Sequence, residues 1–269
     1  MLVGAGDIGV ITHCDAEKTG KLLDAIFATP REGLIFTAGD NSNDSGTASQ
    51  FRACFDHSWG RHKALIRPTP GNHDYRTKNA KPYYQYFGAV AGDADKGYYS
   101  YELGGWHVVV LNGNCKKVGG CEQGSAQEQW LREDLRAHPA KCTLAYWHQP
   151  LFSSGEHHGE PQLRPLWQDL YEAGAELVVN GHDHDYERFA PQTPTGEPDA
   201  ARGIREFVVG TGGAPQRVFE HEVKPNSEVR HYGTFGVLEL TLHATSYDWQ
   251  FVPAEGATFT DRGTTACHD

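Results

Sequence analysis

The hydrophobic and polar positions of this chain form short apolar runs that end abruptly at glycine or at a polar residue. These runs predict β-strands at 2–5, 33–38, 64–67, 98–103, 106–111, 142–147, 176–180, 205–210, 233–242 and 246–252. Several of the runs are continuously apolar rather than alternating, which is typical of strands that are buried on both faces of a sheet. We therefore expect these runs to be buried strands.

Helical periodicity separates several of these strands. The clearest helix is 126–137, where Ser125 and Glu128 resemble a capping box. Its apolar face is expected to contain Ala126, Trp130, Leu131 and Leu135. Further helices are predicted at 16–28 and 162–173. Alternating strands and helices followed by a strand-rich region indicate an α/β (α+β) fold, with one mixed sheet or two packed sheets and helices outside. The composition marks no second unit, so we expect a single domain over residues 1–269.

Five of the apolar runs are followed by short polar motifs. These are Gly6-Asp7, Gly39-Asp40, Gly71-Asn72-His73-Asp74, His148 and Gly181-His182-Asp183-His184. Open α/β sheets bind ligands beyond the carboxyl ends of their strands, so five strands would direct Asp, Asn and His side chains at one point. Carboxylate, amide and imidazole groups are ligands of hard and borderline metal ions. The pattern predicts the site of a two-metal hydrolase.

Each motif is weak by itself. A Gly-Asp pair after a strand is more often a plain turn than a ligand, and a lone histidine such as His148 is more often structural. The prediction rests on the conjunction of all five motifs at strand ends.

The charge and hydropathy of the chain exclude two classes of partner. The 24 basic residues are outnumbered by 35 acidic ones, for a net charge of −11, which argues against nucleic acid as the main partner. No run of about 18 apolar residues is present to span a membrane. An anionic small substrate remains compatible with the negative charge, because bound cations would dominate the local field.

The six cysteines are even in number and contain no C-x-x-C zinc pattern. We expect disulfides, with Cys115 and Cys121 closing a small Gly-rich loop; the alternative is six buried cytosolic thiols. No leader sequence precedes the first predicted strand. We therefore expect a secreted or periplasmic protein in its mature form, after removal of a signal peptide.

At this point the motifs resemble those of the calcineurin-like metallophosphoesterases, and within them the purple acid phosphatase branch. The segment His184-Asp185-Tyr186-Glu187-Arg188 resembles the extended last block of that branch. The resemblance covers most of the chain and implies a four-layer αββα sandwich of two mixed β-sheets flanked by helices.

The resemblance also implies a pair of metal ions and their ligands. The first ion would be bound by Asp7, Asp40 and His184, and the second by Asp40, Asn72, His148 and His182. The implied reaction is attack of a metal-bound hydroxide on the phosphorus of a phosphomonoester, with release of inorganic phosphate.

Four further residues receive catalytic roles from the resemblance. His73 would contact phosphate near the leaving group, and Asp74 would orient its ring. His157 and His158 follow the His148 ligand by nine and ten residues, as an adjacent histidine pair does in purple acid phosphatases. His158 would be the general acid and His157 a phosphate contact, with the assignment between the two left open. The alternative is a solvated loop whose histidines have no catalytic function. The residues expected to bind the substrate phosphate are Asn72, His73 and His157.

The chain departs from the family pattern at the first metal. Purple acid phosphatases carry a tyrosine three residues after the bridging aspartate, but Asn43 follows Asp40 here; other superfamily members carry a histidine at the position of Gly9. Asn43, His13 or water could fill the gap, and we favour Asn43 because it occupies the vacated position. We therefore expect a colourless protein with a divalent pair such as Zn, Mn, Fe(II) or Ca and no ferric tyrosinate. Its working pH should be neutral or alkaline.

These observations predict a metal-dependent phosphomonoesterase that acts on a small-molecule phosphate ester. Two alternatives are a phosphodiesterase or nucleotidase using the same site, and a degenerate member that binds a phosphorylated ligand without turnover. The last is conceivable because the usual tyrosine or histidine ligand is missing.

Overall fold

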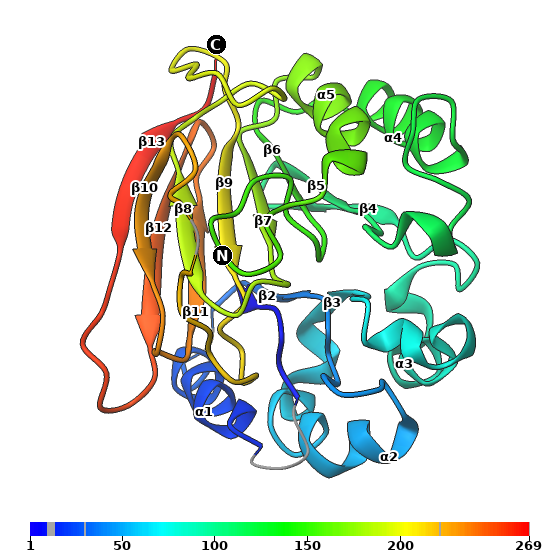
Figure 1. Ribbon diagram of the computed structural model, residues 1–269, viewed down its shortest axis with the longest axis vertical. Helices are drawn as coiled ribbons and strands as arrows, with labels where there is room; N and C mark the ends of the chain where they lie inside the picture. Colours follow the sequence, from blue (N-terminus) through cyan, green and yellow to red (C-terminus); the bar gives the residue numbers. More distant parts are fainter. Residues whose placement is uncertain (10–13, 30, 221, 269) are drawn as a thin grey trace.

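Two mixed β-sheets pack against each other, with helices on the outside (Figure 1). The computed structural model describes residues 1–9, 14–29, 31–220 and 222–268. The first sheet has the strand order β13-β12-β11-β1-β2-β3, and the second has the order β10-β8-β9-β7-β6-β5-β4. The predicted αββα arrangement is thus confirmed, in its form with two packed sheets.

The first sheet combines a parallel half with an antiparallel half. Its parallel strands are β1 (Leu2–Ala5), β2 (Leu34–Ala38) and β3 (Ile66–Thr69). Its antiparallel strands are β11 (Gly236–Leu242), β12 (Ser246–Pro253) and β13 (Arg262–Ala266). Leu2 pairs with Leu34 on one side and with Leu240 on the other, so β1 joins the two halves.

The second sheet has four parallel strands at its centre. They are β5 (Trp106–Val110), β6 (Thr143–Tyr146), β7 (Leu177–Asn180) and β9 (Arg205–Val209). Antiparallel strands flank them, namely β4 (Tyr99–Leu103), β8 (Tyr186–Phe189) and β10 (Ser227–His231).

Helices follow most of the parallel strands. The α-helices are α1 (Ala16–Ile26), α2 (Ala48–Gln50), α3 (Lys81–Phe87), α4 (Ala126–Ala137) and α5 (Arg164–Glu172). A π-helical turn continues α2 over Phe51–Phe55. Short 3₁₀ turns lie at Trp59–Leu65, Asp74–Arg76, Lys78–Ala80, Gly88–Ala91, Cys115–Lys117 and Pro161–Leu163. None of the described helices is long and apolar enough to cross a membrane.

The continuous apolar runs are explained by burial of both faces of the second sheet. Val108 and Val110 belong to the cluster between the two sheets, whereas Val109 belongs to the cluster formed with α4 and α5. In the same way, Tyr146 belongs to the cluster between the sheets and its neighbour Trp147 to the cluster formed with α4 and α5. Because successive side chains of a strand point to opposite faces, a strand buried on both sides needs apolar residues at every position.

Every predicted strand is present within a few residues of its expected bounds, and three strands were missed. The missed strands β8, β10 and β13 carry many polar side chains, as in Arg-Gly-Thr-Thr-Ala of β13. β10 and β13 are sheet edges, where one side of the strand has no neighbour to bury it. Residues 64 and 65 belong to a 3₁₀ turn, so β3 begins at Ile66.

Helix α4 has its predicted bounds, and Trp130, Leu131 and Leu135 of its predicted apolar face pack in the cluster beneath the helix. Ser125 accepts a hydrogen bond from the backbone N–H of Glu128, as predicted, while the Glu128 carboxylate accepts from the N–H of Gly124. Ala126 is exposed, and the buried positions are Gln127, Glu128, Leu131 and Asp134. The polar ones are buried because each finds a partner; for Asp134 it is His107, with 2.8 Å between Oδ2 and Nε2.

All six cysteines form disulfides, as expected. The predicted Cys115–Cys121 pair closes its loop, and the other bonds join Cys14 to Cys54 and Cys142 to Cys267. The last of these ties the start of β6 to the end of β13, 125 residues along the chain.

Candidate metal centre

Three of the predicted metal ligands meet where the two sheets come together. Asp7 and Asp40 follow β1 and β2 of the first sheet, and His148 follows β6 of the second. One ligand atom from each lies within 4.8 Å of the others, and all three side chains are buried. The predicted convergence of strand ends is therefore present in the fold. The backbone N–H of Gly6 links the sheets here by donating to the carbonyl of Val209, at 2.9 Å.

The backbone is strained at several of these residues. Asp7, Asp40 and His182 have positive φ angles of 58°, 49° and 73°. Side-chain-bearing residues rarely adopt this left-handed conformation, and it concentrates at functional sites. It is held here by hydrogen bonds such as Asp7 N–H to the Gly39 carbonyl at 3.0 Å and Ile8 N–H to the Asp40 carbonyl at 3.0 Å.

The motif glycines allow the strand ends to approach closely. A Cβ atom on Gly71 would lie 2.1 Å from Oδ1 and 2.3 Å from the backbone nitrogen of Asp40. A Cβ atom on Gly39, which also has a φ of +81°, would lie 2.5 Å from Nδ1 of His148. Only glycine fits at either position, so these residues are required by the packing of the ligands themselves.

The four ligands predicted for the second metal lie together. Nε2 of His148 is 3.0 Å from Oδ1 of Asn72, 3.2 Å from Nδ1 of His182 and 3.4 Å from Oδ2 of Asp40. The other ring nitrogen, Nδ1, lies 2.7 Å from the Ala38 carbonyl, to which it can only donate. In a neutral ring, Nε2 is then an acceptor that faces the oxygen acceptors of Asn72 and Asp40. Facing acceptors repel one another unless a cation lies among them.

The ligands predicted for the first metal show the same arrangement. Oδ2 of Asp7 accepts from the backbone N–H of His182 at 2.7 Å, but its Oδ1 is buried and has no hydrogen-bond partner among the described residues. That oxygen lies 3.3 Å from Nε2 of His184, whose Nδ1 is 2.9 Å from the Pro215 carbonyl. A buried carboxylate oxygen without a partner is costly, and a metal ion at this position would satisfy it. The residues present therefore fit a bound cation at both positions.

The pKa values of the buried histidines and carboxylates also indicate that the centre favours positive charge. Burial lowers the pKa of His148, but the carboxylates of Asp40 and Asp7 outweigh it and raise the pKa to about 9. For Asp40 burial acts to raise the pKa, yet His148 and His73 hold it well below the usual range. Burial together with His148 lowers the pKa of His182 to about 3. A centre that holds a proton so strongly on one histidine would equally favour a metal cation.

Asn43 lies at the predicted gap in the first site. Its Nδ2 is 3.4 Å from Nε2 of His184, and rotation of the amide would present its oxygen at the same place. Other superfamily members carry histidine at the position of Gly9. Here Gly9 forms an isolated parallel β-bridge with Ser42, and a Cβ atom added to it would lie 2.9 Å from the Asn41 carbonyl oxygen. The third candidate, His13, lies outside the described residues.

His73 enters the site, but Asp74 does not orient it. Nδ1 of His73 lies 3.0 Å from the carbonyl oxygen of Asp44. The Asp74 carboxylate turns the other way and accepts from the N–H of Gly71 at 2.9 Å and from the side chain of Asn41 at 3.1 Å. The expected orienting role of Asp74 thus belongs to the Asp44 carbonyl. Asp74 instead holds the turn after β3, because the start of a 3₁₀ turn directs its side chain inward.

The two adjacent histidines have different neighbours. The His157 ring packs against the His182 ring, with 4.3 Å between centroids, and both its Nδ1 and its backbone N–H contact Oδ1 of Asp183, at 2.9 and 2.8 Å. His158 lines a separate pocket beside Phe152 and Lys224, whose described lining contains no predicted metal ligand. Asp183 was missed by sequence reasoning, although its place between His182 and His184 was a usable signal.

Two further buried carboxylates hold the loop that carries His157, and sequence reasoning did not predict either of them. Glu206 accepts hydrogen bonds from the backbone N–H groups of Leu151 and Phe152, at 2.9 and 3.2 Å. Glu187 accepts from both the backbone N–H and the hydroxyl of Ser154, each at 2.7 Å. Burial raises the pKa of both glutamates. Strands β8 and β9 therefore fix the path of the loop that carries His157.

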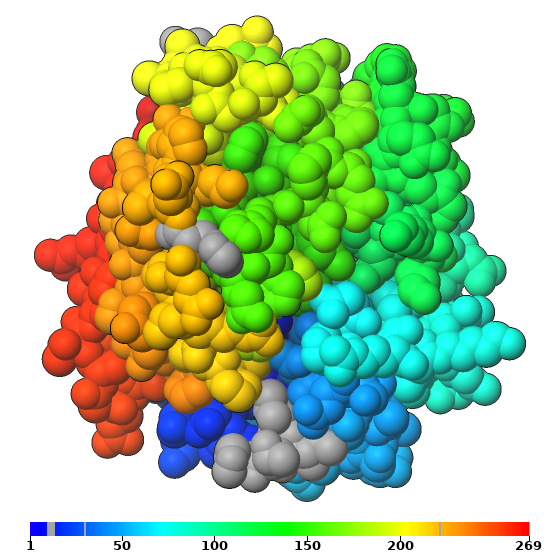
Figure 2. Space-filling model, in the orientation of Figure 1, coloured from blue at the N-terminus to red at the C-terminus, as the bar shows by residue number. Residues whose placement is uncertain are grey.

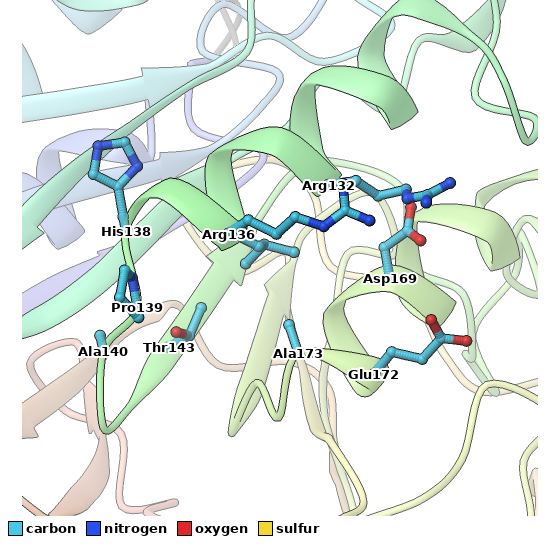
Figure 3. A pocket seen from close by; sticks show the side chains of 10 residues that line it. Arg132, Arg136, His138, Pro139, Ala140, Thr143, Asp169, Glu172 and Ala173 are labelled. Atoms are coloured by element: carbon cyan, nitrogen blue, oxygen red, sulfur yellow. The ribbon is translucent and has the colours of Figure 1, made fainter.

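The surface around the centre is formed by segments distant in sequence. Figure 2 shows the green segment of the 150s beside the cyan segment of the 70s and the yellow-orange segment that follows β9. A different hollow, of about 360 Å³, lies between α4 and α5, where Arg132 and Asp169 extend toward each other (Figure 3). Among the described residues its lining contains no predicted ligand, so it is separate from the centre.

Comparison with known proteins assigns this chain to a family. Residues 3–186 match the family described as calcineurin-like phosphoesterase. The chain is 30% identical over 172 residues to probable purple acid phosphatase 20 of Arabidopsis thaliana, covering 60% of this chain and 39% of that protein. It is 24% identical over 216 residues to purple acid phosphatase 18 of the same plant, covering 69% of this chain and 47% of that protein. The match thus spans less than half of the length of these curated relatives.

Solved structures show the same fold at low sequence identity. A purple acid phosphatase from yellow lupin seeds superposes with a TM-score of 0.81 at 18% identity, over 99% of this chain and 53% of that one. GAP50, described as the anchor in the inner membrane complex of Plasmodium, superposes with a TM-score of 0.73 at 15% identity, over 100% of this chain and 88% of that one. The family match confirms the predicted superfamily, whereas the similar solved structures support the fold alone. With the family match over most of its length and the family motifs gathered at its strand ends, this chain belongs to the calcineurin-like phosphoesterase family.

Proposed function

We propose that this protein is a metal-dependent phosphomonoesterase that hydrolyses phosphate esters at a dinuclear centre and releases inorganic phosphate. The observation that carries the proposal is the convergence of Asp7, Asp40 and His148, whose ligand atoms lie within 4.8 Å of one another in a buried position. Family membership supports phosphoester chemistry. The fold by itself does not, because functions differ among proteins that share a fold.

The proposed ligand sets follow the strand ends. One divalent ion would be held by Asp7, Asp40, Asn43 and His184, and the other by Asp40, Asn72, His148 and His182. Two bound cations would supply Lewis acidity and neutralise charge on the phosphate. Asn43 offers a neutral amide oxygen in place of phenolate, which supports a divalent pair and a colourless protein.

The protein's own residues would orient the phosphate and supply a proton. His73 has its Nδ1 at the Asp44 carbonyl and its Nε2 3.8 Å from Oδ2 of Asp40, so its ring edge faces the centre and can contact the phosphate. During hydrolysis water adds to phosphorus, the ester P–O bond breaks, and the departing alkoxide needs a proton. We assign this proton to His157, because its Nδ1 is held by Asp183 and Nε2 is the ring nitrogen left for the substrate.

The dinuclear centre can be tested by stripping and restoring metals. Elemental analysis and p-nitrophenyl phosphate hydrolysis should be measured after chelation and after addition of Zn, Mn, Fe(II) or Ca. We expect two bound ions, turnover that requires them, an optimum near or above neutral pH, and no visible charge-transfer band. Hydrolysis of bis-p-nitrophenyl phosphate at a higher rate would instead favour a phosphodiesterase. One ion or none, without turnover under any condition, would leave a protein that only binds phosphorylated ligands.

The proton donor can be tested through leaving-group dependence. His157→Ala should slow hydrolysis of an alkyl phosphate by about 10²-fold or more and that of p-nitrophenyl phosphate much less, because p-nitrophenolate departs without a proton. His158→Ala is the matched control and should not slow hydrolysis of the alkyl phosphate selectively. A selective loss with His158→Ala and none with His157→Ala would reverse the assignment.

We also propose that the protein functions outside the cytosol. Its three disulfides are typical of oxidising compartments such as the periplasm or the extracellular space. Cell fractionation with an antibody to the protein checks this, and recovery from the cytosol with free thiols would contradict it.

A further inference from the structure

A second pocket adjoins the loop that carries His157. It has a volume of about 680 Å³ and is formed by parts of three segments, 151–164, 192–198 and 224–226. Pockets of a few hundred to a thousand cubic ångströms are typical of small-molecule sites. Its walls include Leu151 and Phe152, and the Phe152 ring is held edge-to-face against Trp167, with 5.6 Å between centroids. The pocket therefore has a fixed apolar wall.

Residues that line this pocket are close in sequence to residues of the candidate metal centre. Leu151 and Phe152 follow the ligand His148 by three and four residues, and His158 in the pocket is the next residue after His157. Successive Cα atoms are about 3.8 Å apart, so the pocket begins within one residue of the side chain that contacts His182. His157 is the proposed proton donor, so the pocket is lined by residues that adjoin the proton donor along the chain.

The lining of the pocket carries positive charge in a negatively charged protein. The chain has a net charge of −11, yet Lys224 and Arg164 both line this pocket. Within the described part of the chain neither side chain forms an ion pair with a carboxylate; Arg164 also borders the neighbouring hollow toward α4. Glu197 is the acidic residue of the lining. The pocket thus offers two cations to a ligand.

A buried donor without a partner gives a second, independent indication of a ligand. Gln192 lines the pocket and is fully buried. Its Oε1 accepts a hydrogen bond from Nδ2 of Asn226 at 2.8 Å, which fixes the orientation of the amide, but no residue in the described part of the chain accepts from its Nε2. Buried polar groups are nearly always paired, so a ligand oxygen that reached this Nε2 would complete its hydrogen bonding.

We propose that this pocket binds the leaving-group side of the substrate and selects aromatic phosphate esters whose ring carries an anionic group. This inference rests on the proposed phosphatase function. The ring would pack on the Phe152 wall, the anionic group would pair with Lys224 and Arg164, and an oxygen of the ligand would accept from Gln192. An apolar wall beside two cations and an unpaired donor fits such a ligand better than an alkyl phosphate, which would leave all three polar groups without partners.

A pair of phosphonates tests the pocket without any turnover, because their C–P bond is not hydrolysed. Calorimetric titration of the metal-loaded protein should show that 4-carboxybenzylphosphonate binds about tenfold more tightly than benzylphosphonate. The double variant Arg164→Ala/Lys224→Ala should lose this difference and keep its affinity for benzylphosphonate. The matched control Lys21→Ala/Arg52→Ala removes the same two charges from exposed positions on α1 and the turn after α2, and should keep the difference.

The outcomes separate the subsite from the phosphatase function. Equal binding of the two phosphonates by the native protein, or a preference that survives in Arg164→Ala/Lys224→Ala, would overturn the subsite. The charge reversal Lys224→Glu should invert the preference, so a retained preference in that variant would also count against it. Hydrolysis of p-nitrophenyl phosphate by the same preparations reports on the phosphatase function separately, since this substrate carries no carboxylate.

Discussion

Replacing Asp183 by asparagine should weaken both the stability of the protein and its action on poor leaving groups. Asp183 is fully buried and its carboxylate accepts hydrogen bonds from the hydroxyl of Ser153 and from two N–H groups of His157. Burial acts to raise its pKa, but these bonds prevail and lower the pKa to about 2, against an ordinary value of 3.8. Asparagine keeps the shape of the side chain but has no charge to stabilise these contacts.

The size of the effect on stability follows from this difference in pKa. A folded-state pKa below the unfolded one contributes stability above pH 3.8, and this contribution is lost as the pH falls toward 2. At 1.36 kcal/mol per pKa unit it amounts to about 2 kcal/mol at neutral pH. Asp183→Asn should therefore lower the melting temperature of the metal-free protein by about 4 to 8 °C at pH 7. The difference should shrink below about pH 4.

Calorimetry at pH 7 and pH 3 measures this effect directly. Asp248→Asn is the control, because Asp248 also bonds a histidine, with Oδ2 2.8 Å from Nε2 of His243, but about half of its side chain is exposed. That variant should change the melting temperature little. With metal restored, Asp183→Asn should reduce alkyl phosphate turnover by about 10- to 100-fold and p-nitrophenyl phosphate turnover less. An unchanged melting temperature at pH 7, together with unchanged leaving-group dependence, would refute the reasoning.

Three other substitutions probe the centre and the sandwich. Asp40→Ala removes the carboxylate shared by the two proposed ions, so elemental analysis should find one ion or none and turnover should fall to background; a near-native rate would remove its bridging role. Gly71→Ala puts a Cβ atom 2.1 Å from Oδ1 of Asp40 and should destabilise the protein by about 1–3 kcal/mol in urea titration, and an unaltered midpoint would contradict the close packing. Replacing Cys142 and Cys267 by serine opens a link across 125 residues and should cost about 2–5 kcal/mol by the same method, so an equal stability would show that the sandwich closes without it.

The strand ends and the residue types at the centre were readable from the sequence because both depend on local patterns. Asp7, Asp40 and His148 each follow an apolar run directly, and parallel strands bring their carboxyl ends together in any fold of this class. The bounds of α4 were equally local, since Ser125 marks its first turn. Which of the two sheet arrangements formed was supplied by resemblance and not by the patterns themselves.

What the tertiary structure alone decided is the direction of individual side chains in the loops. His157 and His158 are equivalent in the sequence, yet among the contacts of the described residues it is His157 that packs on a proposed metal ligand, because Asp183 holds its ring. Asp74 turned away from the ring of His73 toward Asn41. A loop side chain takes its direction from backbone torsion angles and from partners that are distant in sequence, and neither has a periodic signature. The sequence alone therefore indicates the chemistry of the centre. The positions of the proton donor and of the adjoining pocket depend on how the sheets, helices and loops pack together.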